Sequence, residues 1–113
     1  QLLLSGLNIT VTMCHSKTHN LQRFVADADV LISATGVRGV IDESQIKAGA
    51  IVIDVGMHRI GGKVTGDLDL AQVAERARFY TPVPGGVGPM TIAMLLYNTL
   101  RNAQKLQATT LLA

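Results

Sequence analysis

The chain is 113 residues long and 48% of its residues are hydrophobic, which suits one small domain with an apolar core. Ten Lys and Arg residues against eight Asp and Glu residues give a net charge of +2. The cations are scattered along the chain, so we expect no nucleic-acid partner. A single cysteine, Cys14, excludes an intrachain disulfide framework, and without a long apolar run we expect no membrane partner. These features predict a cytoplasmic protein.

The first half of the chain alternates between strand and helix patterns. In residues 8–14, polar and apolar side chains alternate and β-branched residues are frequent, which predicts a strand. A polar loop over 15–20 leads to a short amphipathic helix that begins near Leu21. Residues 30–34 form a short apolar run, typical of a strand that is covered on both faces.

The middle of the chain continues this alternation. Asp42 and Gln45 have the spacing of a capping box for a single helical turn. Residues 50–56 are the clearest buried strand, and Asp54 near its end is expected to orient loop amides. Residues 57–65 contain two adjacent glycines between short extended pieces, which predicts a hairpin.

The last part of the chain predicts two helices separated by a strand. Asp69 caps a helix over 70–78, and a brief strand follows over 79–81. A long helix is expected with Gly88 as its N-cap and Pro89 at its first position. Its buried face is expected to hold Ile92, Leu95, Leu96, Leu100 and Ala103.

Strands that alternate with helices predict an α/β fold with a doubly wound, mostly parallel sheet of the Rossmann-like kind. We expect residues 1–106 to form a partial dinucleotide-binding domain and 107–113 to form a tail. The first strand of such a fold and its glycine turn have no counterpart here. Residues 1–6 read as the end of a helix, so an upstream segment is expected. Because the first strand is central in the usual order, residues 8–14 and 50–56 would each keep an unpaired edge.

A loop rich in proline and glycine, residues 81–91, precedes the long helix. Its prolines fix φ and remove backbone donors, while its paired glycines let another molecule approach the main chain. Ligands of a doubly wound sheet lie at the carboxyl ends of the strands, which places this loop beside residues 15–18, 34–36 and 55–57. We expect a ligand site there, although such a loop is also a common structural connection.

Several strings of the chain match one enzyme family in the same order. The sequence resembles bifunctional methylenetetrahydrofolate dehydrogenase/cyclohydrolases, specifically their carboxyl-terminal NAD(P)-binding domain. The resemblance rests on the HSKT loop within 10–18, GAIVIDVGMHR over 49–59, GDLD over 66–69 and TPVPGGVGPMT over 81–91. Met57-His58 stands where Ile-Asn is frequent in that family, and Leu68 stands where Val is usual.

The resemblance implies an enzyme of one-carbon metabolism that oxidises methylenetetrahydrofolate with NADP and then hydrolyses the methenyl product to formyltetrahydrofolate. It also implies tetrahydrofolate derivatives as substrates and a homodimer as the assembly. The family's catalytic lysine lies in an amino-terminal folate domain that this chain does not contain. We therefore expect no catalytic residue here and no activity from the chain alone. The alternative is a non-catalytic nucleotide-binding or interaction module derived from a dinucleotide fold.

The motifs that match the family imply two groups of site residues. The implied cofactor contacts are His15, Ser16, Lys17, Ala34, Thr35, Gly36, Gly56 and Met57. The implied folate contacts are Pro84, Gly85, Gly86, Val87 and Gly88. A bulky side chain at Gly85 or Gly86 is expected to obstruct the substrate.

The residues themselves favour NADP over NAD. NAD-specific dinucleotide folds usually place Asp or Glu at the end of the second strand, where it binds the ribose 2′-hydroxyl. Here that position reads Cys14-His15-Ser16-Lys17-Thr18, with no carboxylate and with two side chains that can carry positive charge. Such a loop suits a 2′-phosphate.

The remaining polar residues have plainer interpretations. His15, His19 and His58 match no metal-ligand spacing, so we expect no metal. We expect these histidines to be solvated loop residues, except that His15 is expected to contact a phosphate. Asp67 and Asp69 are expected as turn formers and caps, because no other charged group is spaced to work with them in catalysis.

Overall fold

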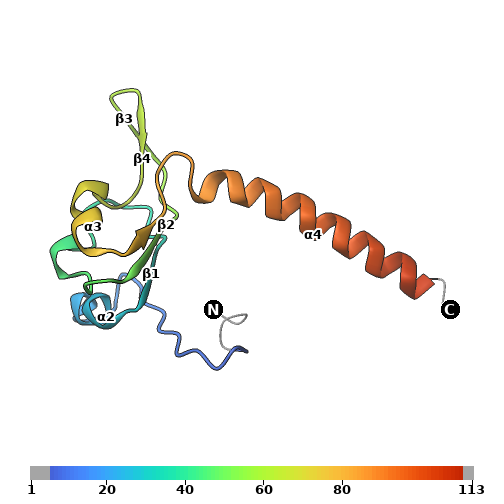
Figure 1. The fold of residues 1–113 in the computed structure, drawn as a ribbon, viewed down its shortest axis with the longest axis horizontal. Helices are drawn as coiled ribbons and strands as arrows, with labels where there is room; N and C mark the ends of the chain where they lie inside the picture. Colours follow the sequence, from blue (N-terminus) through green and yellow to red (C-terminus); the bar gives the residue numbers. More distant parts are fainter. Residues whose placement is uncertain (1–5, 111–113) are drawn as a thin grey trace.

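The computed structural model describes residues 6–110 and contains a three-stranded parallel sheet (Figure 1). Its strands are β1 (Val30–Ser33), β2 (Ile51–Asp54) and β5 (Phe79–Tyr80), in the order β1-β2-β5. β1 pairs with β2 so that Val30 lies beside Ile51, and β2 pairs with β5 on its other side. A parallel sheet with helices between its strands confirms the predicted α/β fold class.

The central position of β2 corrects the predicted strand order. We expected residues 50–56 to keep an unpaired edge, but β2 is hydrogen-bonded on both sides. The strand predicted over 8–14 is also wrong, since residues 9–15 form no strand and Met13 is exposed. A strand needs a hydrogen-bonded neighbour, and within residues 6–110 no segment pairs with this one. A β-branched composition is therefore not sufficient to make residues 8–14 a strand.

Three short helical segments cover one face of the sheet: α2 (Leu21–Asp27), the 3₁₀ helix η1 (Glu43–Gln45) and α3 (Leu70–Arg76) (Figure 1). The core between helices and sheet consists of Val25, Ile41, Ile46, Ala50, Val52, Leu68 and Val73. Successive strand side chains point to opposite faces, and on the other face Val30 and Ile32 are 50% and 51% exposed. The expectation that residues 30–34 are covered on both faces is therefore wrong.

The caps of the short helices follow the sequence signals. Asp42 accepts a hydrogen bond of 3.0 Å from the Ser44 amide at the start of η1. Asp69 accepts one of 3.0 Å from the Ala71 amide at the start of α3. Each carboxylate satisfies an amide that has no partner within the first helical turn. The predicted caps are confirmed, and α3 ends at Arg76 rather than at the predicted position 78.

β3 (His58–Ile60) and β4 (Lys63–Thr65) form the predicted hairpin. The φ angles of Gly61 and Gly62 are 54° and 78°, the left-handed pair that a type I′ turn requires. The Asp67 amide, just beyond β4, donates to the carboxylate of Asp54 over 3.2 Å. The hairpin therefore returns the chain to the carboxyl end of β2.

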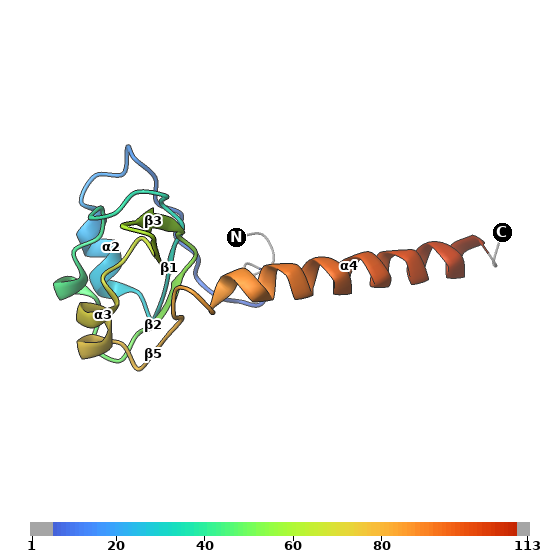
Figure 2. The same cartoon turned by 90° about the horizontal axis from the view of Figure 1, so that it is seen from above.

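The last helix, α4 (Val87–Thr110), extends away from the rest of the chain (Figures 1 and 2). It begins at Val87, so the prediction that Gly88 is the N-cap is wrong. Pro89 still falls within the first turn, where backbone amides have no intrahelical partner and its missing N–H does no harm. The helix continues to Thr110, beyond position 106, after which we expected a tail.

The apolar stripe of α4 is exposed, contrary to the prediction of a buried face. Ile92 is 65% exposed and Leu96 is 68% exposed. The spacing of apolar residues predicts which face of a helix can be buried, but not which element covers it. Within the part of the chain that the structure describes, no helix is long and apolar enough to cross a membrane. The helix end expected over residues 1–6 lies outside the described residues except for Gly6.

Candidate functional site

The carboxyl ends of the parallel strands bring three predicted site segments to one edge of the sheet. Residues 34–36 follow β1, residues 55–57 follow β2 and residues 81–88 follow β5. The Val55 amide donates to the Ser33 carbonyl over 2.8 Å, which ties the first two segments together. The three segments therefore lie together, as the topology predicts.

A pocket of about 420 Å³ lies between the second and third segments. Its mainly apolar wall is formed by Asp54, Val55, Gly56, Met57, Thr91, Ile92 and residues 82–89. Gly56, Met57 and all the predicted folate contacts thus share one cavity, whereas residues 15–17 and 34–36 lie outside its lining. An apolar pocket at the strand ends suits a flat, weakly polar ring.

Two glycines of the loop over 81–88 have different structural reasons. Gly86 has no room for a side chain, because a Cβ there would collide with the carbonyl oxygen of Pro82. Gly85 has a φ of 99°, and a Cβ there would point into open space. Gly85 is therefore favoured by its backbone angle and leaves the outer surface of the loop open, while Gly86 is required by its close contact within the loop. The Val83–Pro84 peptide of this loop is cis.

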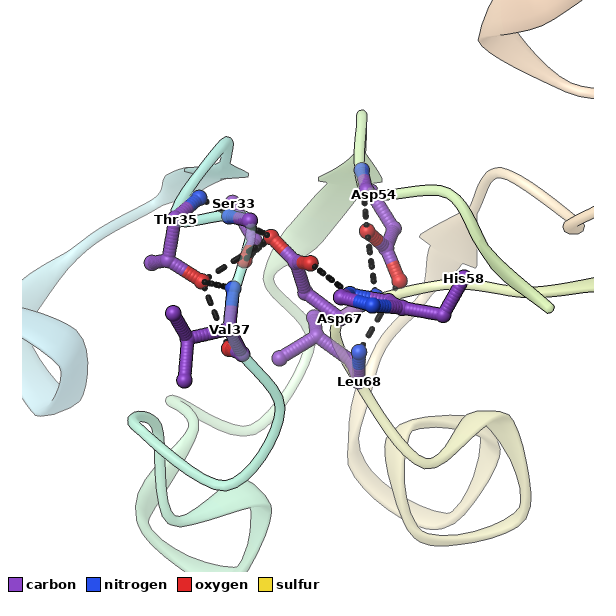
Figure 3. A network of polar contacts seen from close by, with 9 residues as sticks. Ser33, Thr35, Val37, Asp54, His58, Asp67 and Leu68 are labelled. Atoms are coloured by element: carbon purple, nitrogen blue, oxygen red, sulfur yellow. Dashed lines mark hydrogen bonds and ion pairs between the residues drawn. The ribbon is translucent and has the colours of Figure 1, made fainter. Parts of the chain in front are cut away.

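Asp67 is buried behind the turn that follows β1 and holds that turn through one carboxylate oxygen (Figure 3). Oδ2 accepts hydrogen bonds from the amides of Thr35 and Gly36 over 2.9 and 3.0 Å. The Thr35 hydroxyl lies 2.9 Å from the same oxygen and 2.8 Å from the Val37 carbonyl, so its single proton serves one of them at a time. The Ser33 hydroxyl approaches Oδ2 at 3.4 Å. Asp67 thereby fixes two of the predicted cofactor residues.

The second oxygen of Asp67 pairs with His58 (Figure 3). Its Oδ1 lies 2.7 Å from His58 Nε2, and because an ionised carboxylate only accepts, the shared proton belongs to the imidazole. Burial raises the pKa of Asp67, but hydrogen bonds from His58, Gly36 and Thr35 outweigh it, so the pKa lies below its usual value. The prediction that His58 is a solvated loop residue is therefore wrong.

Asp54 supports Asp67 from the end of β2 (Figure 3). Its carboxylate, which is 1% exposed, accepts hydrogen bonds from the amides of Gly56, Asp67 and Leu68 over 2.9, 3.2 and 3.0 Å. A Cβ on Gly66 would overlap the Asp54 carboxylate, and one on Gly56 would overlap Asp67. Both glycines therefore allow the hairpin to approach the strand end. The predicted role of Asp54 in orienting loop amides is confirmed.

The turn over residues 15–18 is held by its own hydrogen bonds. The Thr18 amide donates to the His15 carbonyl, and the His15 amide donates to Thr18 Oγ1, both over 2.8 Å. His15 Nδ1 accepts from the Lys17 amide over 3.1 Å, which places the proton of a neutral ring on Nε2. Ser16 and Lys17 are exposed. The turn is thus preformed and offers the Ser16 hydroxyl, the Lys17 ammonium group and the His15 Nε2–H to a ligand.

The sequence predicts Asp67 only as a turn former, so its contact with the site is an addition from the structure. The hairpin contains the signal that identifies the contact of Asp67 with His58. A two-residue turn at Gly61-Gly62 places His58 beside Thr65, and Asp67 comes two residues later. The partners of Asp67 on the β1 side depend on packing between distant segments, which no local pattern gives.

The chemistry of these segments fits a nicotinamide dinucleotide. The apolar pocket offers a wall for a planar ring, and the turn over 15–18 offers a hydroxyl, an imidazole N–H and an ammonium group as donors to a phosphate. A resident metal ion has no comparable site, because within residues 6–110 no group of three or more His, Cys, Asp or Glu side chains is arranged to hold one.

Comparison with known sequences agrees with this chemistry. A family model described as tetrahydrofolate dehydrogenase/cyclohydrolase, NAD(P)-binding domain, matches residues 1–107. The bifunctional protein FolD of Aquifex aeolicus (strain VF5) is 51% identical over 104 residues, and that of Brevibacillus brevis is 54% identical over 105 residues. Each alignment covers 92% of this chain, but 36% and 37% of the two relatives. The chain thus spans little more than a third of the length of the curated relatives it matches.

Solved structures give the same assignment. The bifunctional FolD enzyme of Campylobacter jejuni aligns with a TM-score of 0.85 at 44% identity, over 91% of this chain and 37% of that one. The Trypanosoma brucei dehydrogenase-cyclohydrolase, complexed with NADP cofactor and inhibitor, aligns with a TM-score of 0.78 at 41% identity, over 87% of this chain and 36% of that one. The family resemblance seen in the sequence is confirmed. The chain belongs to the tetrahydrofolate dehydrogenase/cyclohydrolase family and corresponds to its NAD(P)-binding domain.

Proposed function

We propose that this chain is the NADP-binding part of a bifunctional enzyme that oxidises methylenetetrahydrofolate and hydrolyses the methenyl product to formyltetrahydrofolate. The observation that carries the proposal is the pocket of about 420 Å³ at the carboxyl ends of the parallel strands, walled by the glycine-rich loop. The Trypanosoma brucei relative, whose structure contains NADP, supports the choice of nucleotide.

In this proposal, separate segments bind the two ends of the nucleotide. His15, Ser16 and Lys17 bind the 2′-phosphate, because a hydroxyl, an imidazole N–H and the Lys17 ammonium group donate hydrogen bonds to its negatively charged oxygens. Residues 34–36, at the carboxyl end of β1, contact another part of the cofactor. Gly56 and Met57 form the part of the pocket wall against which the nicotinamide ring lies.

When bound, the nicotinamide ring supplies the hydride acceptor for the oxidation. The contribution of this chain is to position the reactants. Met57 and the loop over 84–88 would form an apolar wall on one side of the ring and reduce its contact with water there. The open outer surface of Gly85 allows the folate to approach the loop. No residue of this chain is assigned a catalytic role.

The nucleotide assignment is tested by calorimetric titration of NADP and NAD. We expect NADP to bind at least about tenfold more tightly, because the 2′-phosphate adds charge-assisted hydrogen bonds. Lys17→Glu should remove most of this preference by placing a carboxylate beside the phosphate. Lys63→Glu makes the same charge change in β4 and should bind both nucleotides as the unaltered chain does. Equal affinity of the unaltered chain for the two nucleotides would refute the assignment to NADP.

The enzymatic assignment is tested in a chimaera in which this chain replaces the matching segment of the Aquifex aeolicus relative. We expect NADP-dependent oxidation of methylenetetrahydrofolate by the chimaera and none by the 113-residue chain alone. A folded chimaera that binds NADP without turnover would favour the alternative, a non-catalytic nucleotide-binding or interaction module. Sedimentation of the active chimaera tests the proposed homodimer.

A further inference from the structure

One carboxylate outside the pocket lining connects two parts of the site. Asp67 is 2% exposed and comes from the turn after the hairpin. Its Oδ2 accepts from both amides of the Thr35-Gly36 turn, and its Oδ1 pairs with His58. His58 directly follows Met57, which lines the pocket. The two oxygens of one side chain therefore join the turn after β1 to the pocket wall after β2.

We propose that Asp67 is a positioning residue for nucleotide binding, which holds the Thr35-Gly36 turn in its binding conformation through Oδ2 and the chain beside Met57 through Oδ1. The inference rests on the proposed function, because it names the residue that shapes the nucleotide site. Asp67 does not contact the ligand in this assignment and acts through the segments that it orders.

The geometry of the turn also limits what part of the nucleotide it receives. Both of its amides donate to Asp67, so they are committed to the protein and not to an anion. A Cβ on Gly36 would point into open space, so a ligand can approach the main chain there. A buried carboxylate behind the turn repels negative charge. The turn therefore suits an uncharged part of the nucleotide, a ribose or a base, rather than a phosphate.

Asp54 completes the support of this arrangement. It accepts from the amides of Asp67 and Leu68, which sets the position of the Asp67 side chain behind the turn. The titratable residues that contact Asp67 are His58 on β3 and Asp54 at the end of β2, through the hydrogen bonds drawn in Figure 3. A rigid, buried support of this kind is what keeps a binding turn in one conformation.

The experiment compares Asp67→Asn with Asp69→Asn in NADP titrations of the 113-residue chain. Both variants remove one negative charge from the same segment, but Asp69 caps α3 and does not contact the turn. We expect the NADP dissociation constant of Asp67→Asn to rise about tenfold, as when the binding-competent turn falls to about a tenth of the population. Asp69→Asn should stay within about twofold of the unaltered chain. An unchanged dissociation constant in folded Asp67→Asn would overturn the inference.

A second measurement uses the unaltered chain and needs no ligand. The amide proton shifts of Thr35 and Gly36 are followed by NMR while the Asp67 carboxyl is titrated with acid. We expect both amides to move together with the Asp67 carboxyl carbon, because both donate to its Oδ2. If the chemical shifts of both amide protons stay constant while the Asp67 carboxyl titrates, the inference is overturned even when Asp67→Asn does not fold. Absence of NADP binding by both the unaltered chain and the chimaera would instead refute the proposed function. If the chimaera alone binds NADP, Asp67→Asn and Asp69→Asn are compared in the chimaera.

Discussion

Asp54 and Asp67 are almost completely buried, yet both carboxylates are satisfied by backbone amides. A buried carboxylate is very costly unless donors surround it, and here the donors come from chain segments far apart in sequence. Each carboxylate therefore fixes backbone that has no regular secondary structure of its own. This is how the loops at the strand ends obtain a defined shape without being part of the sheet.

Asp67 makes the stability of the fold depend on pH. Because its pKa in the folded chain lies below the usual 3.8, its ionised form stabilises the fold above that value. This contribution is lost as the pH falls through the folded pKa, so we expect the free energy of unfolding to decrease below about pH 4. Asp67→Asn should lower the free energy of unfolding by about 2 kcal/mol at neutral pH. Its free energy of unfolding should also fall less on acidification than that of the unaltered chain. Urea unfolding over a pH series measures both, and an identical pH dependence in the variant would contradict this role.

The glycines of the loop before α4 give a second prediction for single residues. Gly86→Ala should lower the free energy of unfolding by about 1–3 kcal/mol, because its Cβ meets the carbonyl oxygen of Pro82. Gly88→Ala is the matched control, since its Cβ would lie 3.8 Å from Met57 Cε, an ordinary contact. Within the helix this control should be neutral or stabilising by up to about 1 kcal/mol. Urea unfolding compares them, and equal stabilities would show that Gly86 is not required by the loop.

At the scale of elements, the hairpin turn controls the position of His58 relative to Asp67. Gly61→Val should cost about 1–2 kcal/mol, because a β-branched residue is strained at the φ of 54° found there. Gly61→Asn is the matched variant and should be tolerated, since Asn-Gly is the preferred type I′ pair. Thermal unfolding compares the two variants. Equal losses from both would mean that side-chain volume, and not backbone conformation, decides at this position.

Local signals predicted the short elements well, because their causes lie within a few residues. Asp42, Asp69 and the paired glycines at 61 and 62 act on neighbouring amides or on their own φ angles. The strand over 8–14 and the buried face of α4 were predicted wrongly because both require a distant partner. The position of the three site segments followed from strand topology. The contact between Asp67 and the turn after β1 did not, since it depends on packing across 31–34 positions of sequence.

The whole molecule is more extended than a compact domain of its size. Its radius of gyration is 17.4 Å, whereas a compact chain of this length has about 13 Å. Part of the difference comes from α4, which extends away from the sheet and the short helices and exposes its apolar stripe (Figures 1 and 2). The open face of the sheet adds further apolar surface, including Val30, Ile32 and Ile51. Exposed apolar surface on this scale favours association.

We therefore expect the isolated chain to associate at micromolar concentration, with a strength that increases in sulfate, because the contact surface is apolar. Sedimentation velocity over a concentration series measures this association. Leu96→Lys should weaken it by placing a charge within the exposed stripe of α4. Asn98→Lys adds the same charge to the same helix outside that stripe and should leave association close to that of the unaltered chain. A monomer that persists at every concentration and melts cooperatively would show that these apolar faces do not drive association.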